Sequence, residues 1–164
     1  MRRANTTRFP WFTARDYSDL VLYRATYDDP ELPRTSAVTV ATPEGMELAL
    51  SDAKLIAALE EKTEQPLDLM QLDIGAYDLM PVSIVTTASL AKLEAAHGAS
   101  LDRRRFRTNI IIESDRLDED WQGQRISFGD SDGAELLIAY PAPRCAMITI
   151  NPETAKRDAN LSYS

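Results

Sequence analysis

The chain is poor in the side chains that build many metal and nucleophile sites. Its 164 residues include one cysteine, Cys145, and one histidine, His97. A single cysteine excludes an internal disulfide, a four-cysteine zinc site and an iron–sulfur cluster built from this chain alone. His97 stands beside a helix stop at Gly98, which assigns it to a helix end and gives Cys–His catalysis little support.

Long apolar runs and an excess of positive charge are also missing. No apolar stretch approaches the roughly 20 residues that a membrane span needs. The basic residues at the start have no apolar segment behind them, so we expect no secretory signal and a cytoplasmic protein. A net charge of −8 and a pI of about 4.7 argue against nucleic acid and against an anionic membrane as partners.

The local patterns predict many short strands and two helices. One helix is expected over residues 52–62, capped by Ser51, and the other follows Ser89 and ends at Gly98. Strands are expected at 20–23, 36–41, 46–50, 67–74, 82–85, 103–112, 135–140 and 146–150. No alternating strand–helix–strand rhythm is visible, which favours a mainly β fold, a barrel or sandwich with a few helices. The polar tail 151–164 is expected to be peripheral.

Residues 103–109 carry the densest positive charge. With a period of two, Arg103, Arg105, Arg107 and Asn109 share one face of the predicted strand. Guanidinium groups bind phosphate through paired hydrogen bonds, so this face suits a phosphate and a polar heterocycle. The alternative is a solvated edge strand whose charges discourage aggregation.

A strand, a hydroxyl-rich turn and a helix follow one another at Thr86 and Thr87. The start of a helix presents free N–H groups and a positive dipole end, which suits an anion. The alternative is that the threonines only cap the helix.

Cys145 follows two prolines and Arg144 and precedes the apolar run 146–150. The prolines indicate a rigid bend, which places Cys145 at the mouth of the predicted strand. A neighbouring cation favours the thiolate, the form that acts as nucleophile and metal ligand. The alternative is a cysteine that is simply a small buried hydrophobe.

Several spaced motifs together resemble the MOSC domain, named for the carboxy-terminal part of molybdenum-cofactor sulfurases. They lie at residues 77–83, 86–90, 104–110, 119–123, 143–145 and 151–154. Residues 12–16 resemble a segment of the β-barrel module that precedes this domain in the mitochondrial amidoxime-reducing component and its bacterial relatives. The resemblance implies a partial amino-terminal module at 1–75 and a MOSC domain core, a β-barrel with a few helices, at 76–164.

The resemblance also implies a molybdenum cofactor, with molybdopterin as its organic part. Cys145 would be the molybdenum ligand and catalytic residue, and pyridoxal phosphate is a cofactor that the resemblance does not favour. The implied cofactor-binding residues are Arg15, Thr86, Thr87, Arg105, Arg107, Asn109 and Arg144. Thr108 departs from the family pattern, which usually has proline there.

The implied activity is the reduction of a small N-hydroxylated or N-oxygenated compound. The electrons would come from a separate electron-transfer protein. Two alternatives stay open: a sulfur carrier or cofactor-handling protein with a persulfide on Cys145, and a binding module without cofactor. A Lys-Ser segment that binds cofactor in the family has no counterpart here, which favours the carrier.

Overall fold

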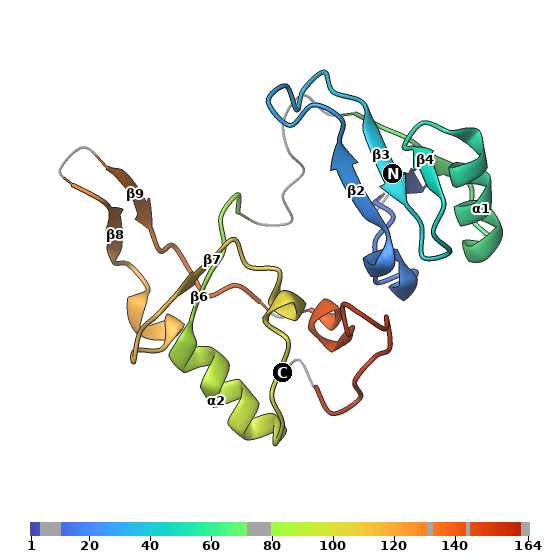
Figure 1. Cartoon of the computed structure of the whole chain (residues 1–164). Coiled ribbons are helices and arrows are strands. Elements are labelled where there is room, and N and C mark those ends of the chain that lie inside the picture. Colours follow the sequence, from blue (N-terminus) through green and yellow to red (C-terminus); the bar gives the residue numbers. More distant parts are fainter. Residues whose placement is uncertain (4–10, 72–79, 131–132, 144, 162–164) are drawn as a thin grey trace. The chain divides into compact units, whose positions relative to one another are not determined.

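The computed structural model describes residues 1–3, 11–71, 80–130, 133–143 and 145–161. The chain divides into two compact units (Figure 1). The first unit contains Met1–Ala76 together with Ile150–Asp158, and the second contains Tyr77–Thr149 together with Ala159–Ser164. No helix in the described ranges is long and apolar enough to cross a membrane.

The first unit is built on a three-stranded antiparallel sheet in the order β2-β3-β4. Its elements are β1 (Arg2–Arg3), η1 (Ser18–Leu22), β2 (Arg24–Tyr27), β3 (Val38–Ala41), β4 (Glu47–Ala49), α1 (Ala53–Thr63) and β5 (Leu67–Asp68). The expected strands at 36–41 and 46–50 are confirmed as β3 and β4, which pair as a hairpin in the register Val40↔Leu48 across a turn at Gly45, whose φ is +85°. The expected strand at 20–23 is wrong: those residues lie mostly in the 3-10 turn η1, and the strand begins at Arg24.

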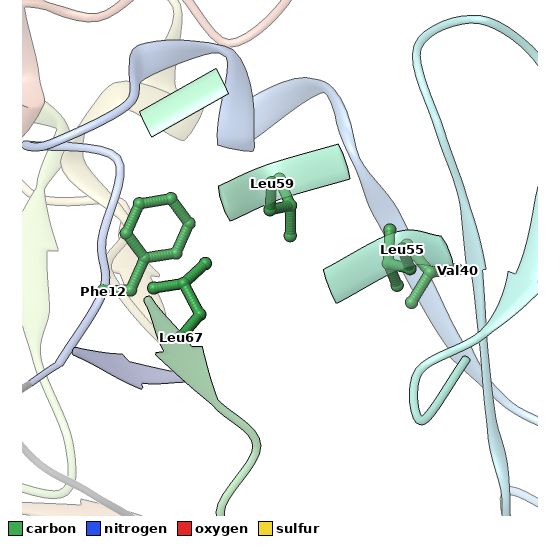
Figure 2. Packing of buried hydrophobic residues seen from close by; sticks show 5 residues of the cluster. All are labelled: Phe12, Val40, Leu55, Leu59 and Leu67. Atoms are coloured by element: carbon green, nitrogen blue, oxygen red, sulfur yellow. The ribbon is translucent and has the colours of Figure 1, made fainter. Parts of the chain in front are cut away.

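Helix α1 closes the core of the first unit. Its N-cap is Asp52, one residue after the expected Ser51, and the Asp52 carboxylate accepts from the Lys54 N–H at 2.8 Å. Leu55 and Leu59, one turn apart on α1, form one buried core with Val40 of β3, Phe12 and Leu67 (Figure 2). Helix α1 therefore buries the face that carries Leu55 and Leu59.

The segment after Thr149 is part of this first unit. Ile150 forms an isolated antiparallel bridge with Arg157, and both Ile150 and Ala155 are buried. The Arg157 guanidinium donates to the carbonyl oxygens of Ala14 and Arg15. The expectation of a peripheral tail is therefore wrong for this part, because its few apolar residues are buried among polar ones.

The second unit contains a strand–helix–strand crossover. Its elements are β6 (Ile84–Thr86), α2 (Thr87–His97), η2 (Arg103–Phe106), β7 (Ile110–Ile112), η3 (Asp118–Trp121), β8 (Arg125–Phe128), β9 (Ala134–Leu137) and η4 (Ala146–Thr149). Strands β6 and β7 are parallel, in the register Thr86↔Ile112, while β8 and β9 form an antiparallel hairpin. The predicted helix ending at Gly98 is confirmed. The sequence shows no alternating strand–helix–strand rhythm, and the second unit contains one such crossover, which the parallel pairing of β6 and β7 requires.

The fold is mixed rather than mainly β. In the described ranges the strands form four open sheets of two or three strands each, and none of them closes into a barrel. Helical turns occupy places where extended chain was expected, notably η2 and η4. Arg105 lies in η2, Arg107 directly follows it, and Cys145 directly precedes η4.

Candidate functional site

Cys145 stands immediately before the helical turn η4, not at the mouth of a strand. The thiol-bearing residue is half-buried. Its carbonyl oxygen accepts from the Ile148 N–H at 3.3 Å, and the Thr149 hydroxyl donates to the Ala146 carbonyl at 2.7 Å. The expected strand at 146–150 is therefore wrong for Ala146–Thr149, and Cys145 is held as the first residue of a hydrogen-bonded turn.

Arg105 fastens this turn to η2. Its side chain is 9% exposed, and its Nη1 donates to the carbonyl oxygens of Ile148 at 3.2 Å and Thr149 at 2.9 Å. The last carbonyls of a helical turn have no partner within the turn, so a buried cation donor suits them. The Arg105 Nε has no hydrogen-bond partner among the described residues. Turns η2 and η4 are thus packed together through one buried guanidinium.

The predicted row of arginines on one face of a strand is wrong. Residues Arg103–Phe106 form the 3-10 turn η2, capped by the Asp102 carboxylate, which accepts from the Arg104 N–H at 2.9 Å. The Arg104 guanidinium also binds Asp102 and lowers the pKa of that carboxyl. Because a turn does not alternate its side chains as a strand does, Arg103 and Arg104 are exposed whereas Arg105 is buried.

Arg107 ends η2 in a left-handed backbone conformation. Its φ is 51° and ψ 31°, its N–H donates to the Arg104 carbonyl at 3.2 Å, and its side chain is exposed. Residues other than glycine adopt this conformation at a cost in free energy. A long cationic side chain at such a position is consistent with a function for the side chain.

Asn109 is tied to Ser83 at the amino ends of β7 and β6. Its side-chain oxygen accepts from the Ser83 N–H at 2.9 Å and from the Ser83 hydroxyl at 3.0 Å. The backbone N–H of Asn109 donates to the Ser83 carbonyl at 3.0 Å. These bonds fix which end of the Asn109 amide is oxygen and which is nitrogen.

Thr86 and Thr87 lie at the carboxyl end of β6, where α2 begins. The Thr86 hydroxyl caps α2 by accepting from the Ser89 N–H, and its own buried N–H donates to Asp118 Oδ1 at 2.6 Å. The Thr87 hydroxyl donates to the Ser114 carbonyl and accepts from the Ser114 N–H, both at 3.0 Å. At about 3.3 Å per residue, three residues separate these groups from Ser83 and Asn109 by roughly 10 Å.

The start of α2 is thus already engaged with groups of the chain itself. A carboxylate at a helix N-terminus satisfies the positive dipole end, as an external anion would. Asp118 stands in the acidic run 118–120, but it is half-buried and binds the Thr86 N–H rather than being simply solvated. Sequence reasoning also missed Ser83. The available signal was its position directly before β6, because Asn109 stands directly before β7, the parallel partner of β6.

Arg15 and Arg144 are the two remaining predicted site residues. Arg15 is exposed in the first unit, on a turn in which the Asp16 carboxylate accepts from the Thr13 N–H and the Arg15 N–H donates to the Thr13 hydroxyl. Arg144 lies outside the described residues. The second unit therefore contributes Cys145, Arg105, Arg107 and Asn109, and turns η2 and η4 connect the first three.

Comparison with known proteins gives the family. The profile of the MOSC domain matches residues 71–163, which is more than half of the chain. The chain belongs to the MOSC domain family. The matched stretch contains every candidate residue of the second unit. No curated protein and no solved structure shows significant similarity to the chain.

Proposed function

We propose that this chain is a molybdenum-cofactor-dependent oxidoreductase that reduces small N-hydroxylated or N-oxygenated compounds. Electrons would come from a separate electron-transfer protein. The observation that carries the proposal is the MOSC match over residues that include a half-buried thiol, Cys145, on a turn packed against the turn ending in Arg107. Membership of the family supports a function related to the molybdenum cofactor, and the reaction is the proposed refinement.

The chemistry of the available donors fits this cofactor. A thiolate is a soft ligand suited to such a metal, and Cys145 is the single cysteine of the chain. Among the described residues there is no group of three His, Cys, Asp or Glu side chains that could hold a metal ion by themselves. The site therefore suits a metal that arrives with most of its ligands, as in a metal–pterin cofactor.

Arg107 and Asn109 would hold the organic part. Both are exposed and lie two residues apart, between η2 and β7. The Arg107 guanidinium offers a fork of donors to a phosphate. Ser83 engages the Asn109 carbonyl oxygen, so the Asn109 NH₂ is the group that would donate to an acceptor on a pterin.

When bound, the cofactor would supply the two-electron chemistry that removes oxygen from the substrate. The chain's own residues would bind it, orient it and limit its exposure to water. Arg15, Thr86, Thr87 and Arg144 remain predicted cofactor contacts. For Thr86 and Thr87 such a contact competes with bonds that the two hydroxyls already make.

The test is the metal and pterin content of protein expressed in a host that makes the cofactor. Cys145→Ser and Arg107→Ala are compared with Arg103→Ala, a matched control that removes an exposed arginine from the same turn. The proposal predicts near-stoichiometric molybdenum and pterin in the wild type and in the control, and a strong loss in Arg107→Ala. The loaded protein should reduce N-hydroxylated compounds with a chemical electron donor.

Wild-type protein free of molybdenum and pterin would contradict the proposal. A persulfide on Cys145 in that protein would then favour the sulfur carrier. Loaded protein without reductase activity would leave a cofactor-handling role and reject the oxidoreductase.

A further inference from the structure

Arg105 is the one charged residue that the described part of the chain buries. Burying a cation costs free energy, and an apolar side chain of similar volume often stabilises a protein as well or better. The cost is increased here because the buried Nε donor has no partner among the described residues. Filling space in the core therefore does not explain an arginine at this position.

The Arg105 guanidinium donates hydrogen bonds to two consecutive backbone carbonyls, those of Ile148 and Thr149. These are the last carbonyls of the turn η4, and the Cys145 carbonyl at its start accepts from the Ile148 N–H. Cys145 and Thr149 are thus the two ends of one small hydrogen-bonded unit. By binding the Ile148 and Thr149 carbonyls, Arg105 also fixes the position of Cys145 at the start of the turn.

The same arginine belongs to η2, which ends at Arg107. Two residues after Arg105, the chain presents the exposed guanidinium assigned above to the phosphate. One side chain therefore sets the position of the sulfur of Cys145 relative to Arg107. A cofactor held at both points requires that separation to be constant, because binding groups contribute fully only when they are pre-organised.

We propose that Arg105 is a positioning residue that holds the Cys145 turn in place against η2, rather than a residue that touches the cofactor. This inference rests on the proposed function, because a bound cofactor is what requires Cys145 and Arg107 to keep a constant separation. It differs from the role that family resemblance alone suggests for this arginine. The local part, a clamp on the thiol-bearing turn, is tested without cofactor.

The experiment measures the alkylation rate of Cys145 by iodoacetamide in folded protein prepared without cofactor. Because the chain has one cysteine, the reagent reports on this turn alone. Arg105→Met removes both hydrogen bonds, and we expect alkylation at least about tenfold faster as the half-buried thiol becomes accessible. Arg105→Lys keeps one donor, and we expect an increase of about threefold.

Two controls separate positioning from general destabilisation. Arg103→Met removes the same charge from the same turn without touching the clamp, and should alkylate at the wild-type rate. Val85→Ala destabilises the second unit through its core, where Val85 is buried in β6. Its alkylation rate should stay close to wild type although its urea midpoint falls.

Three results would overturn the proposal. One is wild-type alkylation in Arg105→Met. Another is the same acceleration in Val85→Ala at equal loss of stability, which would make Arg105 merely structural. If Arg105→Met does not fold, wild-type alkylation in Arg105→Lys decides against it.

Molybdenum content is the second readout, in protein from the cofactor-producing host. We expect it to fall about tenfold or more in Arg105→Met and to recover partly in Arg105→Lys. If the wild type itself holds no molybdenum, the proposed function fails. The order of alkylation rates still tests the clamp in that case, so the two failures are distinguishable.

Discussion

Replacing Arg107 by glycine should separate stability from function. Arg107 has φ 51° and ψ 31°, a backbone conformation that costs a residue with a Cβ about 1–2 kcal/mol. Glycine removes that cost but adds about 0.4–1 kcal/mol of chain entropy to the unfolded state. We therefore expect Arg107→Gly to raise the free energy of unfolding by about 0.5–1 kcal/mol, or to leave it unchanged.

The same substitution should strongly reduce cofactor retention. One hydrogen bond from a guanidinium to a charged group contributes about 1.5–3 kcal/mol, so its loss weakens binding by about tenfold to a hundredfold. The assays are urea unfolding followed by circular dichroism, and molybdenum and pterin content of the purified variant. A variant that is at least as stable as the wild type and yet holds little cofactor would identify Arg107 as a binding residue.

Glu64→Gly is the matched control for this experiment. Glu64 ends α1 with φ 53° and ψ 32°, nearly the same conformation, but lies in the first unit. It should show the same gain in stability with unchanged cofactor content. The reasoning is refuted if Arg107→Gly keeps its cofactor, or if it loses more than about 1 kcal/mol of stability, since the side chain would then have a structural role.

Three further predictions concern the framework. Asp118→Ala should lower the free energy of unfolding by about 1–2 kcal/mol in urea titrations, because the buried Thr86 N–H loses its acceptor; an unchanged midpoint would reject that role. The Glu94 carboxylate accepts from the Leu101 N–H, which lowers the pKa of Glu94. Its contribution to the free energy of unfolding is therefore fully present above the ordinary pKa of a carboxyl group and is lost as pH falls through the lowered pKa. Glu94→Gln should therefore flatten the acid side of the unfolding midpoint against pH, and an identical profile would contradict this. Leu55→Ala should cost about 2–5 kcal/mol because Leu55 is 2% exposed in the core of Figure 2, and a cost below 1 kcal/mol would contradict that packing.

Elements with local signals could be predicted from the sequence. Helix α2 starts at a threonine cap and stops at Gly98, whose φ of +79° is easiest for glycine. The β3–β4 hairpin has its signal in the Gly45 turn. In these places one or two residues decide the local backbone, and the prediction was confirmed.

The candidate site contained the largest errors because its conformation depends on distant partners. The stretch 103–109 has side chains that alternate acceptably for a strand, yet the Asp102 cap starts a 3-10 turn there. Asp102 before three consecutive arginines was the available signal, since aspartate commonly caps helical turns. The apolar, β-branched run after Cys145 predicted a strand, but its carbonyls are bound by Arg105, 43 and 44 residues earlier in the chain. No local pattern contains that contact.

Cys145 stays a predicted site residue, whereas its expected backbone setting at the mouth of a strand is wrong. It lies within the residues that the family profile matches, and in the structure the residue is half-buried. What the sequence could not provide was the clamp between η2 and η4, which relates Cys145 to Arg107. The proposed cofactor site depends on the relative positions of Cys145 and Arg107.

X-ray absorption at the molybdenum edge tests the central claim most directly. It compares the sulfur coordination of molybdenum in the loaded wild type with that in Cys145→Ser. If Cys145 is the metal ligand, the molybdenum that Cys145→Ser retains has one sulfur neighbour fewer than the molybdenum of the wild type. An identical sulfur shell in the two proteins, or wild-type protein that acquires no molybdenum in a cofactor-producing host, would contradict the account.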